Sequence, residues 1–139
     1  MFNIRYATDK DLSVWPQFDK HISQSELLIK INLKRCYILE NGENIIGLLR
    51  YNMFWDNIPF LTMIYIDEAA RDKSFGRQAI LYWEDEMRAL GFPCVMTSSQ
   101  ADENAQFFYR KLGYKDTGCL ILDIPAIRQP AEIFFIKEL

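Results

Sequence analysis

Three positively charged residues, Arg71, Lys73 and Arg77, fall within one short stretch of the chain. They follow Ile58–Ile66, an almost wholly apolar run of the kind that forms a strand buried on both faces. A helical pattern of apolar residues begins at Phe75, so the charges surround the start of a predicted helix. The first turn of a helix has unpaired N–H groups and a partial positive charge, and both attract phosphate. These residues therefore predict a site for a phosphorylated ligand.

The helix after this loop is defined by apolar residues at helical spacing, namely Phe75, Ala79, Ile80, Trp83, Met87 and Leu90. Gly91 follows directly and predicts the end of the helix. The same residues also fit a bland alternative, in which an ordinary strand-to-helix connection carries a few solvated surface cations.

The loop sequence narrows these alternatives. Arg71-x-x-Ser74-x-Gly76 resembles the (Gln/Arg)-x-x-Gly-x-(Gly/Ala) signature of the GNAT family of N-acetyltransferases, although Ser74 stands where the family usually has glycine. The resemblance implies that the loop holds the pyrophosphate of coenzyme A. The residues that it assigns to cofactor binding here are Tyr65, Ile66, Arg71, Asp72, Lys73, Ser74, Phe75, Gly76 and Arg77.

A second segment, Ala105–Tyr114, resembles the family pattern A-x-x-(L/F)-Y-x-K-(L/F)-G-(F/Y). Enzymes of this family attack the thioester of acetyl-CoA directly with a neutral amine. The resemblance implies that a backbone N–H near Ile66 stabilises the thioester oxygen, and that Tyr109 protonates the departing thiolate. The alternative for Tyr109 is a purely structural role, as one of three aromatic residues that pack a helix onto the sheet.

Two further assignments stay open. The family's asparagine, three residues before the alanine of this pattern, falls on Asp102, while Asn104 stands two residues later; either could contact the pantetheine arm. The general base is not indicated by any one residue. The candidates are Asp67, Glu68, Glu103, Glu26, His21 and a water relay. Aromatic residues that could line an acceptor pocket, but that more commonly fill a core, are Trp15, Tyr51, Trp55 and Phe60.

The elements that position these residues follow from hydrophobic patterning and turn signals. Alternation predicts a first strand at Phe2–Tyr6, and a short helix is expected through Asp11–Trp15, limited by Pro16. Ser23-x-x-Glu26 predicts the start of a helix that runs to Arg35. Asn41-Gly42 predicts a hairpin between strands at 36–40 and 45–51, and residues 55–57 predict a second turn.

The second half of the chain predicts a strand–helix–strand unit. Cys94–Thr97 reads as a buried strand parallel to Ile58–Ile66. Ser99-x-x-Asp102 predicts the start of a helix that ends at Leu112, before Gly113. Strands at Thr117–Ile124 and Ala131–Lys137 complete the order, joined across residues 125–130.

This order is that of the GNAT fold. We expect an α/β protein in which a mixed central sheet of six to seven strands is flanked by about four helices. The sheet splays between its fourth and fifth strands, where the resemblance places acetyl-CoA. At 139 residues, residues 1–139 are expected to form a single domain.

Composition excludes several classes of protein. Half of the residues are hydrophobic and a quarter are charged, which is typical of a globular chain. The net charge of −3 argues against a nucleic-acid-binding surface, and no apolar run approaches the ~20 residues of a membrane helix. The three cysteines show no metal-ligand spacing and read as reduced thiols of a cytoplasmic protein. We therefore expect no metal, no nucleic acid and no membrane.

The sequence thus predicts acetyl transfer from acetyl-CoA to a primary amine, carried by a small molecule or a peptide. One alternative is a non-catalytic acyl-CoA-binding or regulatory module with the same fold, which Ser74 and the missing base favour. A second is a phosphate-binding domain of another α/β type, which does not need the Ala105–Tyr114 pattern. An exposed C-terminal strand would allow pairing in a homodimer.

Overall fold

The computed structural model describes residues 1–139, and its chain divides into two compact units. Unit 1 consists of Met1–Asn52 and Thr62–Trp83, and unit 2 consists of Met53–Leu61 and Glu84–Leu139. The boundary between the units falls inside the predicted central strand, after Leu61.

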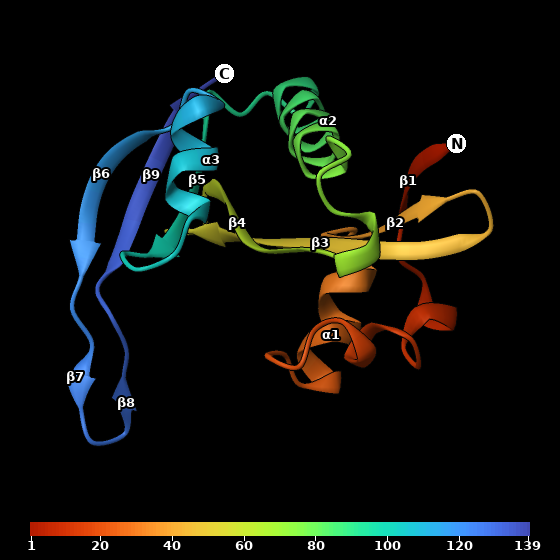
Figure 1. Cartoon of the computed structure of the whole chain (residues 1–139), viewed down its shortest axis with the longest axis horizontal. Coiled ribbons are helices and arrows are strands. Elements are labelled where there is room, and N and C mark those ends of the chain that lie inside the picture. Colours follow the sequence, from red (N-terminus) through yellow and green to blue (C-terminus); the bar gives the residue numbers. More distant parts are fainter. The chain divides into compact units, whose positions relative to one another are not determined.

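Unit 1 is built on antiparallel strands (Figure 1). Its elements are β1 (Phe2–Tyr6), α1 (Gln24–Asn32), β2 (Cys36–Asn41), most of β3 (Asn44–Phe54), the end of β4 (Ile58–Ile66) and the start of α2 (Phe75–Ala89). The β2–β3 pairing closes at Asn41 opposite Asn44, which leaves Gly42 and Glu43 as the loop. Gly42 has a φ of 63°, a conformation that glycine adopts without strain, so the predicted hairpin is present with its loop one residue later.

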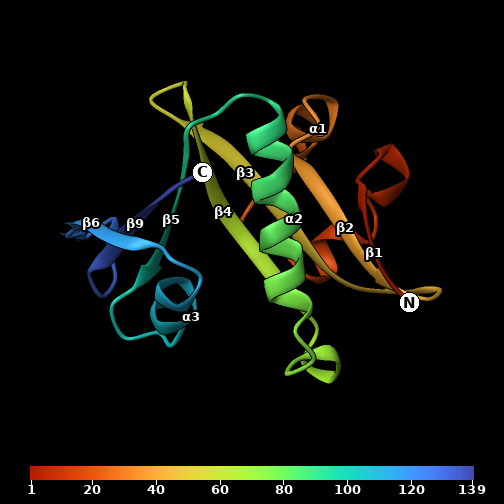
Figure 2. The ribbon, with the colours of Figure 1, turned by 90° about the horizontal axis from the view of Figure 1, so that it is seen from above.

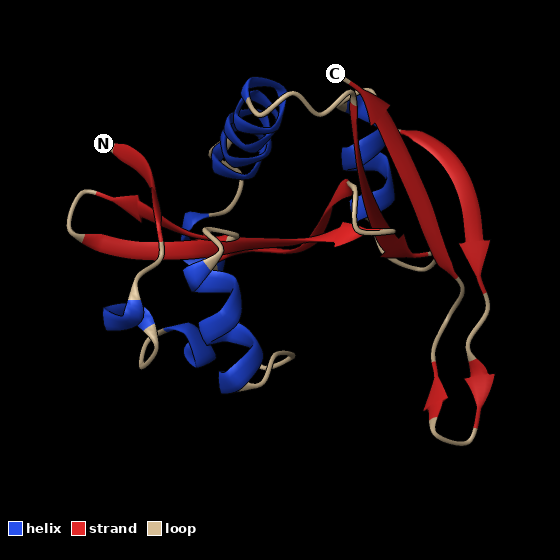
Figure 3. Ribbon diagram, turned by 180° about the vertical axis from the view of Figure 1, so that it is seen from behind, coloured by secondary structure: helices blue, strands red, loops and turns tan.

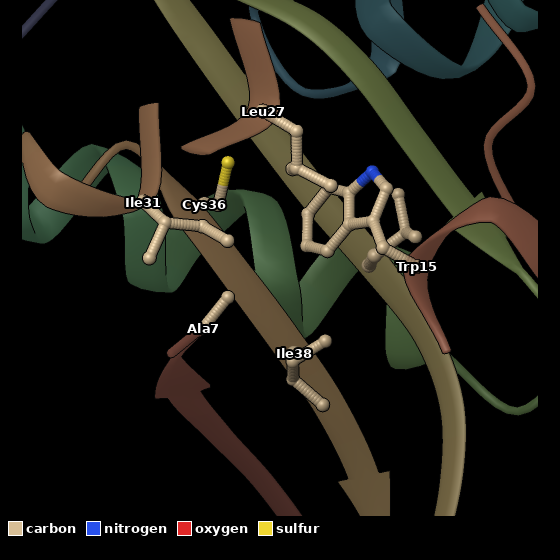
Figure 4. Close-up of a cluster of buried hydrophobic side chains, with 7 residues drawn as sticks. Ala7, Trp15, Leu27, Ile31, Cys36 and Ile38 are labelled. Atoms are coloured by element: carbon tan, nitrogen blue, oxygen red, sulfur yellow. The ribbon is translucent and has the colours of Figure 1, made fainter. Parts of the chain in front are cut away.

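Two apolar layers cover the strands of unit 1. Seen from above, α2 runs across β3 (Figure 2), and α1 lies on the opposite face of these strands (Figure 1). Figure 4 shows the layer beneath α1, in which alternate residues of β2 point toward the helix. Its buried members are Ala7, Trp15, Leu27, Ile31, Cys36, Ile38 and Leu48. The intervening residues of β2 face α2, where the Tyr37 ring meets that of Tyr82 at 6.3 Å.

A buried ion pair anchors the segment that precedes α1. Asp19 accepts hydrogen bonds from Trp15 Nε1 at 3.0 Å and from Arg50 Nε at 2.7 Å. Burial alone raises the pKa of Asp19, but the hydrogen bonds from Arg50, the His21 N–H and Trp15 lower it below its usual value. The carboxylate is thus fully satisfied, as a buried charge must be.

Unit 2 carries the rest of the sheet, helix α3 and the last turns of α2. Its elements are the ends of β3 and α2, the start of β4, β5 (Cys94–Gln100), α3 (Ala105–Lys111), β6 (Lys115–Leu120), the small hairpin β7 (Asp123–Ile124) and β8 (Ile127–Arg128), and β9 (Glu132–Glu138). Phe60 pairs with Met96 and Leu61 with Thr97 in parallel, so the predicted strand–helix–strand unit is confirmed.

The seven main strands are hydrogen-bonded in the order β1-β2-β3-β4-β5-β9-β6, and β7 and β8 form a separate two-stranded sheet. The expected mixed sheet of six to seven strands is therefore present with seven. The chain has three α-helices, whereas about four helices were expected. The missing helix is the one predicted at Asp11–Trp15. This region instead forms two 3₁₀ turns, Asp9–Asp11 and Trp15–Gln17, the second containing Pro16.

The predicted start of α3 was wrong. Ser99 and Asp102 were expected to open the helix, but β5 continues through Gln100 and Ser99 pairs with Ile133 of β9. The helix begins at Ala105, with Asn104 preceding it. A Ser-x-x-Asp pattern carries no information about strand pairing, and here the pairing with β9 determines where β5 ends and α3 begins.

The C-terminal strands also differ from expectation. The strand predicted at Thr117–Ile124 is divided into β6, which pairs with β9, and β7, which pairs with β8 in a separate hairpin (Figure 3). The C-terminal strand β9 is not an exposed edge, since it lies between β5 and β6. The two edge strands are β1 and β6, and the residues of β6 are all exposed.

Two global properties follow from the structure. None of its helices has the length and apolar character needed to cross a lipid bilayer. No group of three histidine, cysteine, aspartate or glutamate side chains lies together as a metal site would require.

Candidate active site

The first part of the candidate site is the segment that joins β4 to α2, all of it in unit 1. A 3₁₀ turn at Glu68–Ala70 ends the strand, and Arg71 is extended. Asp72 and Ser74 then adopt φ values of 62° and 66°, the left-handed region that favours glycine. The backbone reverses at these two residues before α2 begins at Phe75.

This geometry leaves backbone donors unpaired. The Gln78 N–H makes a helical bond to the Ser74 carbonyl oxygen at 3.0 Å. The N–H groups of Phe75, Gly76 and Arg77 have no acceptor in the protein, as expected for the first turn of a helix. These donors and the positive end of the α2 dipole create an anion-binding geometry.

Three exposed cations border these donors. Arg71 donates from Nε to the Ile66 carbonyl oxygen at 2.8 Å, and its guanidinium carbon lies 5.4 Å from the centre of the Tyr65 ring. Arg71 is thereby tied to the end of β4. Lys73 and Arg77 are exposed and form no ion pair. Their charges are available to a ligand.

Three contacts that position this segment were not foreseen from the sequence. A Cβ at Gly47 of β3 would lie 2.1 Å from the Tyr65 carbonyl oxygen, so only glycine allows the two strands to approach here. The Asp67 N–H donates to the Ile46 carbonyl oxygen at 2.7 Å. At the other end, the Phe75 ring stacks on Phe2 at 4.7 Å. A glycine inside an apolar run was the available signal for the close approach.

The strand that leads into this segment is more open than its composition suggests. Ile58–Ile66 was expected to be buried on both faces, but only Pro59 and Leu61 are buried. Thr62 is exposed and the residues from Met63 to Ile66 are half-buried. An apolar run reports strand propensity and does not by itself report what covers the strand.

The second part of the candidate site is Tyr109, in unit 2. Its side chain is 5% exposed, and its ring packs against Phe135 at 5.9 Å and Tyr114 at 5.7 Å. The hydroxyl lies beside Thr97, and the Thr97 hydroxyl donates to the Leu61 carbonyl oxygen at 3.0 Å. Burial raises the pKa of Tyr109 to about 12, so the phenol is neutral at any physiological pH.

The remaining predicted residues are divided between the two units. Asp102 is exposed, and Asn104 precedes α3 without a side-chain cap hydrogen bond. Among the candidate bases, Glu103 accepts the Gln100 N–H at 2.9 Å, which gives its carboxylate a local structural role. Asp67 and Glu68 belong to the 3₁₀ turn after β4, and Glu26 and His21 are exposed near α1.

The four aromatic residues considered for an acceptor pocket divide into two pairs. Trp15 is fully buried and Tyr51 is 5% exposed, so both fill the core of unit 1. Trp55 is 77% exposed and Phe60 is half-buried, and both belong to unit 2. A hollow of about 530 Å³ in unit 2, lined by Pro93, Cys94, Lys115 and Lys137 among others, contains none of the predicted site residues.

A family model matches this chain over residues 5–114, and that model describes the acetyltransferase (GNAT) family. The chain belongs to this family. The matched segment includes both the Arg71–Arg77 loop and the Ala105–Tyr114 pattern on which the sequence resemblance depended.

Solved structures of this family share the fold. The Ard1 protein from Thermoplasma volcanium is similar with a TM-score of 0.85 at 14% identity, over 99% of this chain and 97% of that one. The ribosomal-protein-S18-alanine N-acetyltransferase from Escherichia coli gives 0.81 at 16% identity, over 99% and 94%. The PaiA N-acetyltransferase from Thermoplasma acidophilum, in complex with coenzyme A, gives 0.77 at 17% identity, over 100% and 99%.

Proposed function

We propose that this protein is an N-acetyltransferase that transfers the acetyl group of acetyl-CoA to a primary amine. The amine nitrogen attacks the thioester carbonyl carbon, the carbon–sulfur bond breaks, and the thiolate of CoA takes up a proton. The nitrogen loses its own proton to water or to a base. The observation that carries the proposal is the set of unpaired N–H groups at the start of α2, surrounded by three exposed cations.

In this proposal the cofactor residues have distinct tasks. The N–H groups of Phe75, Gly76 and Arg77 donate to the pyrophosphate, and Lys73 adds charge. Arg71 is already bonded to the Ile66 carbonyl oxygen, so it also fixes the end of β4, from which the family's oxyanion donor comes. Tyr65 and Ile66 are held in position by the close approach of Gly47.

Tyr109 is the proposed proton donor to the thiolate. Its neutrality at physiological pH supports this role, because an acid must still hold its proton when the carbon–sulfur bond breaks. This proton transfer is uphill, because a phenol with a pKa of about 12 protonates a thiolate whose conjugate thiol has an ordinary pKa of ~8.5.

The burial of Tyr109 supports a second candidate function. A tyrosine that is 5% exposed and packs against Phe135 and Tyr114 is fully accounted for by a structural role, which is what a non-catalytic acyl-CoA-binding module of this fold requires. Such a module binds acetyl-CoA at the α2 N-terminus and turns over no amine.

Two measurements test the function. Isothermal titration of the purified protein with acetyl-CoA is expected to give at least micromolar affinity, with a rise in Tm at a hundredfold excess that corresponds to about 2.7 kcal/mol. Release of free thiol from acetyl-CoA is then followed with a panel of primary amines. Binding with amine-dependent thiol release supports the enzyme, binding without it supports the module, and absence of binding overturns both.

A further inference from the structure

The sheet of unit 2 has one face that no helix of the same unit covers. Register places Ser98 of β5 opposite Phe134 of β9, and Gln100 opposite Glu132, so these side chains project from one face. Phe60 pairs with Met96 and shares that face. Helix α3 lies on the other face, where Tyr109 meets Phe135 and Thr97. We call the face that carries Ser98, Glu132 and Phe134 the Glu132 face.

Glu132 is an unusual carboxylate within this unit. Ser98 Oγ donates to Oε2 at 2.7 Å and Gln129 Nε2 donates to Oε1 at 2.9 Å. Both donors are neutral, and Glu132 takes part in none of the ion pairs of the chain, although it is half-buried. The two hydrogen bonds fix the orientation of the carboxylate and leave its charge uncompensated.

Glu84 of the same unit is a carboxylate with a structural role, and its charge is paired within the fold. It is 1% exposed, accepts the Tyr114 hydroxyl at 2.8 Å, and pairs with Lys137 Nζ at 2.7 Å. Its charge is matched by a cation within the fold. Glu132 is held by two neutral side chains and has no such cation, so its charge is available to a cationic partner from outside.

Aromatic rings gather beside Glu132. The Phe134 side chain, two residues along β9 on the same face, lies 5.7 Å from the Phe60 ring and 6.4 Å from the Phe54 ring. Phe54 and Trp55 lie 4.8 Å apart. Trp55 is 77% exposed and has a φ of 53°, in a turn where Asp56 also has a positive φ. A bulky residue in that conformation is strained, and this turn holds an indole in solvent at the end of the ring cluster.

A carboxylate next to aromatic rings fits one ligand chemistry. The carboxylate attracts an ammonium group through a charged hydrogen bond, and the rings accept the apolar body beside it and add cation–π attraction. A ligand with its own carboxylate next to the amine would be repelled by Glu132. The arrangement therefore discriminates between amines and amino acids.

We infer that the Glu132 face binds the acceptor of the proposed reaction, and that this acceptor is a primary ammonium carried on an apolar or aromatic group without an adjacent carboxylate. The inference rests on the proposed function. Glu132 holds the ammonium, and Phe60 and Phe134 receive the apolar body. Glu132 is assigned binding and selectivity, and the proton of the ammonium is lost to water after the nitrogen is positioned.

The test compares 2-phenylethylamine with L-phenylalanine, which differ by the carboxylate, at saturating acetyl-CoA. The parent is expected to prefer the amine by at least tenfold in kcat/KM. In Glu132→Gln the KM for 2-phenylethylamine rises tenfold or more and the preference over L-phenylalanine collapses. Glu138→Gln, an exposed carboxylate on the same strand, is the matched control and keeps the parent's values. A tripeptide amide beginning with phenylalanine distinguishes a peptide N-terminus from a small amine as the source of the ammonium.

Equilibrium binding separates failure of this inference from failure of the proposed function. Binding of 2-phenylethylamine to the protein with CoA present is measured by saturation-transfer NMR, with Tm recorded for each variant. Amine binding that is lost in Glu132→Gln and kept in Glu138→Gln supports the inference even where no thiol is released. Phe134→Leu weakens the same binding if the rings take part, and it serves should Glu132→Gln fail to fold. Unchanged amine binding and unchanged selectivity in Glu132→Gln overturn the inference, whatever the result of the thiol assay.

Discussion

The Arg71–Arg77 loop of unit 1 and the Glu132 face of unit 2 present opposite charges by different means. The loop offers backbone N–H groups and exposed cations on a strained, irregular segment. The Glu132 face offers one half-buried carboxylate that two side chains hold on regular strands. Unpaired backbone donors suit a multiply charged phosphate, whose position is set by many weak contacts. One oriented carboxylate suits a single ammonium, whose position is set by one strong contact.

The largest expected effect tests whether unit 2 contributes chemistry as well as binding. Tyr109→Phe keeps the ring and its contacts with Phe135 and Tyr114 but removes the hydroxyl. If Tyr109 protonates the thiolate, kcat falls by roughly 10²–10⁴-fold while acetyl-CoA affinity is unchanged. Steady-state kinetics at saturating acetyl-CoA measures this. A parent-like kcat would make Tyr109 a packing residue and leave protonation to water.

The next effect tests whether the loop works as described. Lys73→Ala combined with Arg77→Ala removes two exposed charges from the start of α2. Charged hydrogen bonds contribute ~1.5–3 kcal/mol each, so coenzyme A affinity should fall by about 10²-fold or more in titration calorimetry. Lys20→Ala, an exposed lysine of unit 1 outside the loop, is the control. Equal affinities for all three proteins would mean that the cations are ordinary surface charges.

How far the sequence reaches differs between these two regions. The loop could be predicted because its cations and the helix start are contiguous, and the periodicity from Phe75 to Ala89 places the helix. The Glu132 face could not, because Ser98, Glu132 and Phe60 come from three strands and share a face only through register. A slip of one residue would reverse every side chain.

The local failures have the same origin. Ser99 was predicted to cap α3 because its spacing to Asp102 matches a cap, yet pairing with Ile133 keeps it in a strand. Gly47 inside an apolar run signals a close approach, but its partner, the Tyr65 carbonyl oxygen that a Cβ would meet at 2.1 Å, is decided by strand packing. Patterns within a few residues of one another predict elements, and contacts between distant residues decide their ends and their exposed faces.

Gly47 gives a third prediction, on how unit 1 holds the end of β4. Gly47→Ala places a methyl group against the Tyr65 carbonyl oxygen, so the strands must separate, at a cost of about 1–3 kcal/mol. Urea denaturation should show this loss, and coenzyme A affinity should fall with it. Gly118→Ala in the edge strand β6, where a Cβ meets nothing within 4 Å, is the control. Similar stability for both variants would contradict the packing constraint.

The pH dependence of stability tests whether the Tyr109 phenol of unit 2 is buried as the structure shows. The pKa of Tyr109 is raised from 10.0 to about 12. The protonated phenol therefore contributes fully to the free energy of unfolding below pH 10, and this contribution is lost as the pH rises toward 12. By pH 11 the parent should have lost about 1.4 kcal/mol that Tyr109→Phe does not lose. Urea denaturation of both proteins at pH 9, 10 and 11 measures the difference in slope. Parallel curves would mean that the phenol titrates normally and is not held in the core.

The smallest expected effect concerns Ser74, where backbone strain and a contact with the ligand can be distinguished. Ser74 has a φ of 66° in the position where the family usually has glycine. A residue other than glycine in the left-handed region costs ~1–2 kcal/mol of stability, and glycine removes this cost. Glycine also increases the conformational entropy of the unfolded chain, which cancels part of the gain. Ser74→Gly is therefore expected to raise Tm slightly.

Coenzyme A affinity decides what the Ser74 hydroxyl does. The hydroxyl makes no hydrogen bond within the protein, so it is available to a phosphate oxygen, and we expect both Ser74→Gly and Ser74→Ala to bind coenzyme A about three- to tenfold more weakly. Ser74→Ala keeps the Cβ and its strain, so it loses the contact without the gain in Tm. Tighter binding by Ser74→Gly alone would show that the loop was limited by strain, because only glycine relieves it. Parent-like binding by both variants would leave recognition in this loop to the N–H groups and the cations.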